Sequence, residues 1–371
     1  IDSTACGQAA SWMIQHGYSF DFISDTQLKH TTLLGRDIIS EGGNRYRTIL
    51  IPAAACMDHE TLQHLVDLAK QGANILFWRS LPEKVPGLFE YEKREEALHR
   101  LTDQISLNAR GTALPGSGTI TVSDKLEALM QKAELHREEL VDHDLQFIRR
   151  RNKDHISYFI VNQSGHPTDT LLRFSESFIS ARIMDPMTGR SGVATPVFHG
   201  RESTLHLQLV PGESRIVQLY ASELKGEPWP VLEASGTAYE VQGEWMIEFM
   251  EGGPLIPEPV RTYTLKSWTE FQDAKLESFA GAARYSIEFL LPEVQADSWI
   301  LDLGDVRESA RVWINDRPVG ILVSQPYRTD IAPFIHEGFN KLSVEVTNLS
   351  ANRIRDLDRR AVPWKKFEDI N

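Results

Sequence analysis

The residues best able to do chemistry gather in the segment HREELVDHD, residues 136–144, which holds two histidines and four carboxylates. On a helix, His136, Glu139 and His143 would share one face, and imidazole and carboxylate groups are common metal ligands. The order of these residues is not the His-Glu-x-x-His pattern of a zinc-binding helix. We therefore interpret the segment as a solvated helix end at the entry to a new domain, and we predict no metal site.

Other motifs that could carry chemistry are incomplete. The segment PGSGT, residues 115–119, is Gly-Ser-Gly and not the Gly-x-Ser-x-Gly of a nucleophile elbow. The sequence contains no phosphate-binding P-loop and no dinucleotide fingerprint, so we identify no cofactor. The two cysteines, Cys6 and Cys56, have no metal-binding spacing, and we expect both to be reduced and mostly buried. No catalytic residue can be assigned from these patterns.

Composition narrows the classes of partner. The formal net charge is −13 and the pI is about 5.4, which argues against nucleic acid and anionic membranes. Basic clusters at residues 149–151 and 359–360 lie among acids and are typical of solvated surface. No apolar run approaches the roughly 20 residues of a membrane helix. We predict neither nucleic-acid nor membrane partners.

Aromatic residues offer a second kind of chemistry, because their faces stack on the C–H surfaces of sugars. Seven stand out in the last third of the chain: Trp245, Trp268, Tyr285, Trp299, Trp313, Tyr327 and Trp364. The competing interpretation is that they fill a core, where each buries a large area. We expect Trp245, Trp299 and Trp313 to be core residues. Trp268, Tyr327 and Trp364 lie near expected loops, where we favour a core or domain-interface position over a sugar contact. Trp268 and Tyr327 are also kept as candidates for carbohydrate or domain contacts.

The elements that must position these residues fall into three segments. Residues 1–138 alternate helical and strand patterns, including the buried-strand run TILIP followed by a helix with Asp58 as N-cap and Gly72 as its end. This order predicts an α/β domain with a flavodoxin-like parallel sheet. The chain begins on a helical pattern, so we expect the first strand of that sheet to precede Ile1 in a longer protein.

The pattern of the remaining residues, from 139 onward, predicts all-β structure. Residues 139–222 hold short strands with turn signals every ~8 to 12 positions, which is typical of a β-sandwich. The polar segment 221–234, with two prolines, is the best candidate for a linker. Residues 223–371 form a second β-rich domain without a closing strand, so we expect it to be truncated.

The last domain resembles a known family. The runs Leu301-Asp302-Leu303-Gly304 and Pro326-Tyr327-Arg328 resemble the sugar-binding-like jelly roll of family 2 glycoside hydrolases. The ending, with Val346-Thr347-Asn348-Leu349, Asn352-Arg353 and Asp356, is similar to the C-terminal region of α-L-rhamnosidases of glycoside hydrolase family 106. The two upstream segments resemble the same family in the same order, the first through an α/β sheet like that of glutamine amidotransferases.

The resemblance implies a role and a partner. In that family two carboxylates of a (β/α)₈ barrel cleave terminal L-rhamnose from glycans, and the barrel precedes the α/β domain. Nothing here matches the barrel, so the implied role is an inactive accessory portion whose partners are that missing N-terminal catalytic barrel and a rhamnose-containing glycan. The carbohydrate or barrel-interface candidates are Trp268, Tyr327, Arg328, Asn352 and Arg353. Family analogy implies a periplasmic or extracellular location.

Two alternatives stay open. The chain is also consistent with a stand-alone, non-catalytic carbohydrate-binding or scaffolding protein, which weak glycan binding without any upstream barrel would favour. A third possibility is an enzyme whose site lies in the α/β domain. That possibility requires a nucleophile or a cofactor loop, and the sequence shows neither.

Overall fold

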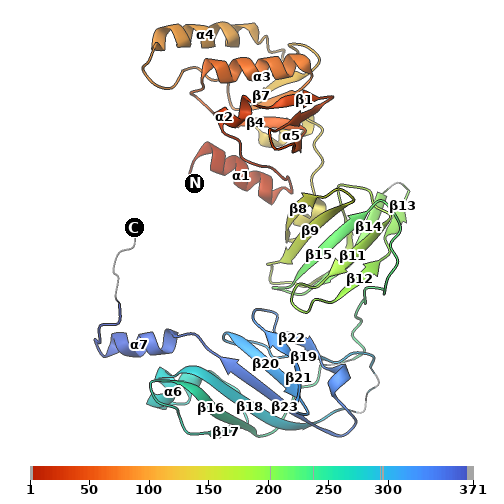
Figure 1. Ribbon diagram of the computed structural model, residues 1–371, viewed down its shortest axis with the longest axis vertical. Coiled ribbons are helices and arrows are strands. Elements are labelled where there is room, and N and C mark those ends of the chain that lie inside the picture. The colour runs from red at the N-terminus through yellow and green to blue at the C-terminus, as the bar shows by residue number, and fades with distance from the viewer. Residues whose placement is uncertain (1–2, 201, 237, 293, 295, 366–371) are drawn as a thin grey trace. The chain divides into compact units, whose positions relative to one another are not determined.

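A computed structural model describes residues 3–200, 202–236, 238–292, 294 and 296–365 (Figure 1). The chain is β-rich, with several separate sheets and few helices. It divides into two compact units, each considered by itself below. The first holds residues 1–143, 172–177 and 198–204, and the second holds residues 144–171, 178–197 and 205–371.

The first unit is built on a four-stranded sheet in the order β4-β5-β7-β6. Strands β4 (Thr48–Pro52), β5 (Asn74–Trp78) and β7 (Thr119–Ser123) run parallel, as their apolar runs predict, whereas β6 (Thr112–Ala113) is antiparallel to β7. The other elements are α1 (Ala5–Gln15), α2 (Asp25–Leu28), α3 (His59–Gln71), α4 (Tyr91–Gln104), α5 (Leu126–Lys132), the 3₁₀ turn η1 (Glu139–His143), and a small sheet of β1 (Thr32–Leu34), β2 (Asp37–Ile39) and β3 (Arg45–Tyr46).

Helix α3 illustrates how local sequence signals determine the packing and the ends of a helix in this unit. Its apolar stripe, with Leu62 and Leu65, belongs to the core that contains Ile75 of β5. Asp58 is the N-cap, and its Oδ1 accepts a hydrogen bond from the Glu60 backbone N–H at 3.0 Å. Gly72 ends the helix with a φ of 131°, a value that side chains disfavour. Both predicted ends of this helix are confirmed.

The Asp58 cap makes a prediction about acid stability. Burial opposes ionisation of Asp58, but the Glu60 N–H and the Arg94 guanidinium outweigh it and lower the pKa of the carboxyl. A lowered pKa stabilises the fold above the unfolded value of about 3.9, and the contribution disappears as the pH falls through the folded value. Asp58→Ala should therefore cost about 1 kcal/mol in urea unfolding at pH 7, and less at pH 3. Asp58→Asn keeps the cap and should lose only the pH dependence. An Asp58→Ala cost that is the same at both pH values would contradict this account.

The middle β segment holds two sheets. A five-stranded sheet has the order β12-β11-β15-β9-β8, and a three-stranded sheet has the order β10-β14-β13. Their bounds are β8 Leu145–Arg151, β9 His155–Asn162, β10 Thr168–Arg173, β11 Ser180–Met184, β12 Ser191–Ala194, β13 Val197–His199, β14 Glu202–Leu209 and β15 Ser214–Tyr220. Alternate residues of β9 are buried, Tyr158 completely, as the period of two predicts.

The predicted linker is only partly a linker. Backbone hydrogen bonds join Val193 of β12 to Glu227 at 2.7 Å and to Trp229 at 2.8 Å, so the segment extends the edge of the five-stranded sheet. The Arg215 guanidinium lies 5.5 Å from the Trp229 ring centroid. A Cβ at Gly192 would lie 2.7 Å from the Trp229 backbone, so the close approach requires glycine.

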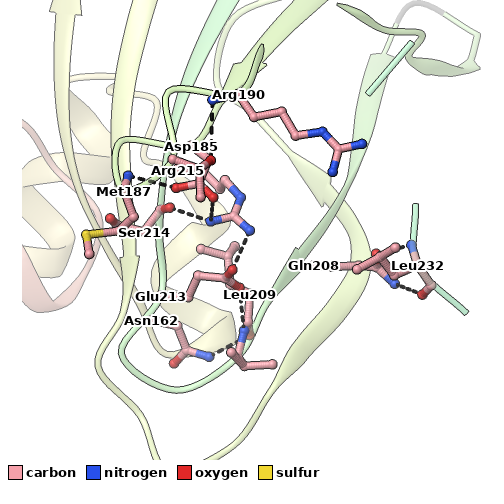
Figure 2. A network of polar contacts seen from close by, with 12 residues as sticks. Asn162, Asp185, Met187, Arg190, Gln208, Leu209, Glu213, Ser214, Arg215 and Leu232 are labelled. Atoms are coloured by element: carbon pink, nitrogen blue, oxygen red, sulfur yellow. Dashed lines mark hydrogen bonds and ion pairs between the residues drawn. The ribbon is translucent and has the colours of Figure 1, made fainter. Parts of the chain in front are cut away.

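Figure 2 shows the polar network around Arg215. This guanidinium donates to the Ser214 carbonyl at 2.8 Å and pairs with Glu213, while Asp185 lies 3.9 Å away. Asp185 Oδ1 also accepts the Met187 backbone N–H at 2.8 Å. The network therefore fixes the turn between β11 and β12, where Asp-Pro and Thr-Gly signals predict one.

The last segment contains a six-stranded sheet in the order β17-β16-β18-β23-β20-β21 and a two-stranded sheet of β19 and β22. The strands are β16 Trp245–Gly253, β17 Val260–Thr262, β18 Ala280–Leu290, β19 Ile300–Asp302, β20 Ser309–Ile314, β21 Arg317–Leu322, β22 Arg328–Asp330 and β23 Phe339–Thr347. Short helical elements complete it: η2 Trp268–Glu270, α6 Ala274–Ser278, η3 Ala332–Phe334 and α7 Ala351–Arg359.

Two predictions about burial are wrong. Trp313 is not a core residue: Ala310, Val312 and Ile314 of β20 point into the core, so the pleat turns Trp313 to the other face, where it is half-buried. Trp245, by contrast, is buried as predicted. Cys6 and Cys56 are free but exposed, because Cys6 lies in the solvent-facing first turn of α1 and Cys56 follows β4 in a surface loop.

None of the described helices is long and apolar enough to cross a membrane.

Candidate functional site

Two loops of the last segment carry exposed, paired charges. We call the set Asp302, Asp305, Arg307, Tyr327 and Arg328 the loop rim. Strands β19 and β22 place Asp302 directly opposite Arg328, and Arg328 Nε donates to Asp302 Oδ2 at 2.7 Å. The other carboxylate oxygen accepts the Gly304 backbone N–H at 2.9 Å, which fixes the start of the first loop.

The second charged pair lies three residues further along this loop. Arg307 Nε and Nη2 each donate to one Asp305 oxygen at 2.8 Å, a bidentate arrangement. The hydrogen bond from Arg307 lowers the pKa of Asp305, and the same bond raises the pKa of Arg307. The loop rim therefore presents two oriented guanidinium–carboxylate pairs, which suit hydroxyl or carboxylate recognition and not proton donation.

Tyr327 supports the rim from inside. Its ring is only 4% exposed and belongs to the core, and its hydroxyl donates to the Glu308 carbonyl at 2.6 Å. Burial raises the pKa of this hydroxyl. Because the ring has no free face, Tyr327 positions the loop that carries Arg307 and does not itself offer a stacking surface.

Trp268 is buried in a different place, a second core cluster of this segment. Its side chain is 6% exposed, and its ring lies 5.4 Å from Phe249 and 5.5 Å from Phe279 by centroid distance. The indole Nε1 donates to the Tyr285 hydroxyl, whose pKa is raised by burial. Trp268 therefore has no surface on which a sugar could stack.

Asn352 and Arg353 lie on α7, a helix with no fully buried residue. Asn352 Nδ2 donates to the Phe279 carbonyl at 3.4 Å, beside Asn348, which donates to the same carbonyl at 3.2 Å. Arg353 pairs with Asp356 of the same helix at 2.9 Å. The motif residues thus hold the segment after β23 against the start of β18, while Arg353 remains half-exposed.

The structure divides the five predicted residues into two groups. Tyr327 and Arg328 belong to the loop rim, whereas Trp268 and Asn352 contact Phe279. Arg353 contacts Asp356 of its own helix. Sequence reasoning missed Asp305 and Arg307 in the rim. The signal was present, because Asp-x-Arg directly after a glycine turn is a short-range charged pair on an expected loop.

Neighbouring groups favour the ionised form of several carboxyl groups among the described residues. Five have a pKa lowered from the ordinary value: Asp58, Glu60, Asp154, Asp169 and Asp305. In four of them the largest influence is a hydrogen bond from a neighbouring side chain, and in Asp58 burial opposes the shift. A glycosidase acid needs a raised pKa, so none of these five suits that role.

Contacts within the segment 136–144 and with residues 173–175 hold this segment in place. Arg137 pairs with Asp142, and Arg173 lies 3.4 Å from Glu139. Glu138 is 1% exposed, and its carboxylate accepts the Ser175 backbone N–H at 2.9 Å. Among the described residues no group of three or more histidine, cysteine or acidic side chains is placed to hold a metal ion.

Comparison with known proteins identifies a family that this chain matches. A model of glycoside hydrolase family 106, described as alpha-L-rhamnosidase, matches residues 2–195, just over half of the chain. A solved rhamnosidase from Novosphingobium sp. PP1Y has a TM-score of 0.73 and 23% identity, and the match covers 91% of this chain and 32% of that one. At that identity the likeness concerns the fold.

A curated relative is similar over a shorter stretch. The protein, from Formosa agariphila and named "Putative beta-glucuronidase", is 34% identical over 140 residues, which is 37% of this chain and 11% of the relative. The chain thus spans about a tenth of the curated relative and about a third of the solved rhamnosidase.

Proposed function

The chain belongs to glycoside hydrolase family 106, and from that premise we propose that it is an accessory, non-catalytic portion of an α-L-rhamnosidase-like enzyme. The whole enzyme would hydrolyse terminal L-rhamnose from glycans. Its two catalytic carboxylates would lie on a barrel that precedes these residues, and this chain would brace the barrel and shape the substrate cleft.

The observation that carries the proposal is the fold likeness to one third of a rhamnosidase over nearly all of this chain. We assign the exposed guanidinium groups of Arg307 and Arg328, and the half-exposed group of Arg353, to contact with the barrel or the glycan.

The finer architecture belongs to the same proposal. Residues 1–138 would be a flavodoxin- or glutamine-amidotransferase-like domain, residues 139–222 a β-sandwich, and residues 223–371 a jelly roll. Parallel β4, β5 and β7 support the first assignment, and the antiparallel six-stranded sheet supports the last.

An assay with 4-nitrophenyl α-L-rhamnopyranoside tests the proposal. The purified 371-residue chain should release no 4-nitrophenol above a heat-denatured control. A protein expressed from the same reading frame with its upstream region should release it, with a rate proportional to enzyme concentration. Turnover that scales with the purified chain would refute the accessory role, and an inactive longer protein would refute the rhamnosidase assignment.

A further inference from the structure

Strand β4 lies at the edge of the parallel sheet, yet its sequence is that of an interior strand. Among the described strands only β5 pairs with it, so one row of β4 backbone N–H and C=O groups faces no strand. The strand carries no charged residue, although charges normally shield edge strands. Ile49 and Ile51 lie in the core cluster that contains α3 residues, and Leu50 lies in the cluster that contains α1 residues. A parallel strand with both faces covered normally has a neighbour on each side.

Helix α1 runs back along the sheet from the carboxyl ends of the strands. Near its start, Gln8 Oε1 accepts a hydrogen bond from Arg79 Nη2 at 3.5 Å, and Arg79 directly follows β5. After the helix, Asp21 Oδ2 accepts the Tyr46 hydroxyl at 2.6 Å, and Tyr46 lies two residues before β4. The helix therefore has the direction of a crossover between parallel strands, so a strand that leads into it runs parallel to β4.

The start of α1 also sets where such a strand ends. Thr4 is the N-cap, and its Oγ1 accepts the Gly7 backbone N–H at 3.0 Å. Loops that join a strand to a helix in α/β units have about 2–6 residues, so the strand would end near Ile1 and lie upstream of it. The 11 residues of α1 span about 16 Å, which matches the ~17 Å of a five-residue strand such as β4.

The residues after α1 also lack a partner strand among the described residues. Residues 18–24 belong to no strand, although Phe20, Phe22 and Ile23 make this segment apolar. Phe22 is 68% exposed and Ile23 is 41% exposed. In a flavodoxin-like sheet the strand after the first helix pairs with the first strand, on the side away from the third. A strand beside β4 would therefore lie between β4 and residues 18–24, with its side chains packed beside Phe22 on one face and Ile23 on the other.

We propose that the free edge of β4 is an acceptor for one β-strand, and that its occupant is the segment of the longer polypeptide directly upstream of Ile1. This donor strand runs parallel to β4, pairs with its free edge and with residues 18–24, and directs apolar side chains into both cores. Whatever precedes the donor strand is then joined to this unit by backbone hydrogen bonds and not by a free linker. The inference rests on the flavodoxin-like assignment of the domain and is independent of the rhamnosidase assignment.

Hydrogen exchange of the purified 371-residue chain tests the acceptor edge. The probe is a synthetic peptide of about 12 residues, the length of one strand and its loop, with the sequence directly upstream of Ile1 in the source reading frame. It should slow exchange of the β4 amides that face the free edge by about tenfold or more, and leave those of β9 unchanged. The same peptide with a central proline lacks a backbone donor and should protect far less. A chain extended upstream by these residues should show the protection without added peptide.

Phe22→Ala distinguishes the donor strand from non-specific hydrophobic binding. Phe22 is exposed in the chain alone, so the substitution should leave the unfolding midpoint nearly unchanged and raise the Kd of the peptide by about two- to fivefold. The matched control is Phe89→Ala, which removes a phenylalanine of the same unit that is 79% exposed and lies outside the sheet. It should leave the Kd of the peptide unchanged.

Three results would overturn the proposal. Protection of β4 by neither the peptide nor the upstream extension would leave the edge without its donor strand. Equal protection by the proline peptide would show that backbone pairing is not the cause. Protection that appears without peptide and rises with protein concentration would identify a second copy of this chain as the occupant. The rhamnoside assay measures hydrolysis, so it succeeds or fails independently.

Discussion

Replacing Phe279 with alanine should lower the free energy of unfolding of the last β segment by about 3–5 kcal/mol. The ring is completely buried and lies 5.3 Å from Phe249 by centroid distance, in an edge-on contact. The substitution removes this packing but keeps the backbone carbonyl that accepts from Asn348 and Asn352. Urea unfolding, with signals specific to the second unit from hydrogen exchange, measures the loss.

Trp313→Ala is the comparison. Although the indole is larger than the Phe279 ring, its removal should lower the free energy of unfolding by less. Trp313 lies half-buried on the face of the strand that points away from the core, so we expect a loss below about 2 kcal/mol. Phe339→Ala, at an exposed position of β23, should cost under about 0.5 kcal/mol and calibrates surface aromatics. If Trp313→Ala destabilised the fold as much as Phe279→Ala, the indole would act as a core residue despite its position on the other face of the strand.

The contrast also shows how far the sequence predicts this segment. The alternation of Ala310, Val312 and Ile314 was visible in the sequence and already implied that Trp313 faces the other way. The expectation of a core tryptophan rested on its size, and size does not decide which face of a strand a side chain occupies. Period-two patterning was the better guide.

Local signals were reliable elsewhere as well. The ends of α3 follow from Asp58 and Gly72, residues whose caps depend only on neighbours within a few positions. The parallel order of β4 and β5 follows from two apolar runs with a helix between them. Antiparallel β6 has only two residues, too few to leave a periodic signal.

The candidate site could be predicted only in part, because its contacts join distant parts of the chain. Trp268 lies next to predicted loops, yet it is buried by Phe249 of β16 and by Phe279, the C-cap residue of α6. The Asn348 contact with Phe279 spans 69 residues, and no local pattern reveals it. Asp302 and Arg328 each belong to a recognisable motif, but their pairing became evident only from the register of β19 with β22.

Gly17→Ala should be among the most destabilising substitutions in the first unit. Gly17 has a φ of 79°, and a Cβ there would lie 2.2 Å from the Glu138 carbonyl oxygen. The Glu138 backbone N–H also donates to the Gly17 carbonyl at 2.9 Å, so the two backbones cannot separate without breaking this bond. We expect a loss of about 2–5 kcal/mol, the combined cost of a left-handed alanine and of overpacking.

Gly35→Ala separates those two costs, because it keeps the backbone term and removes the clash. Gly35 has a φ of 66°, and a Cβ there would meet nothing within 4 Å, so we expect only about 1–2 kcal/mol. Hydrogen exchange of the α1 amides should then rise in Gly17→Ala and stay near the wild-type rate in Gly35→Ala. Equal costs for the two variants would mean that the approach of Glu138 to Gly17 relaxes freely. Unequal costs would show that this buried contact holds the end of α1 to the residue before η1.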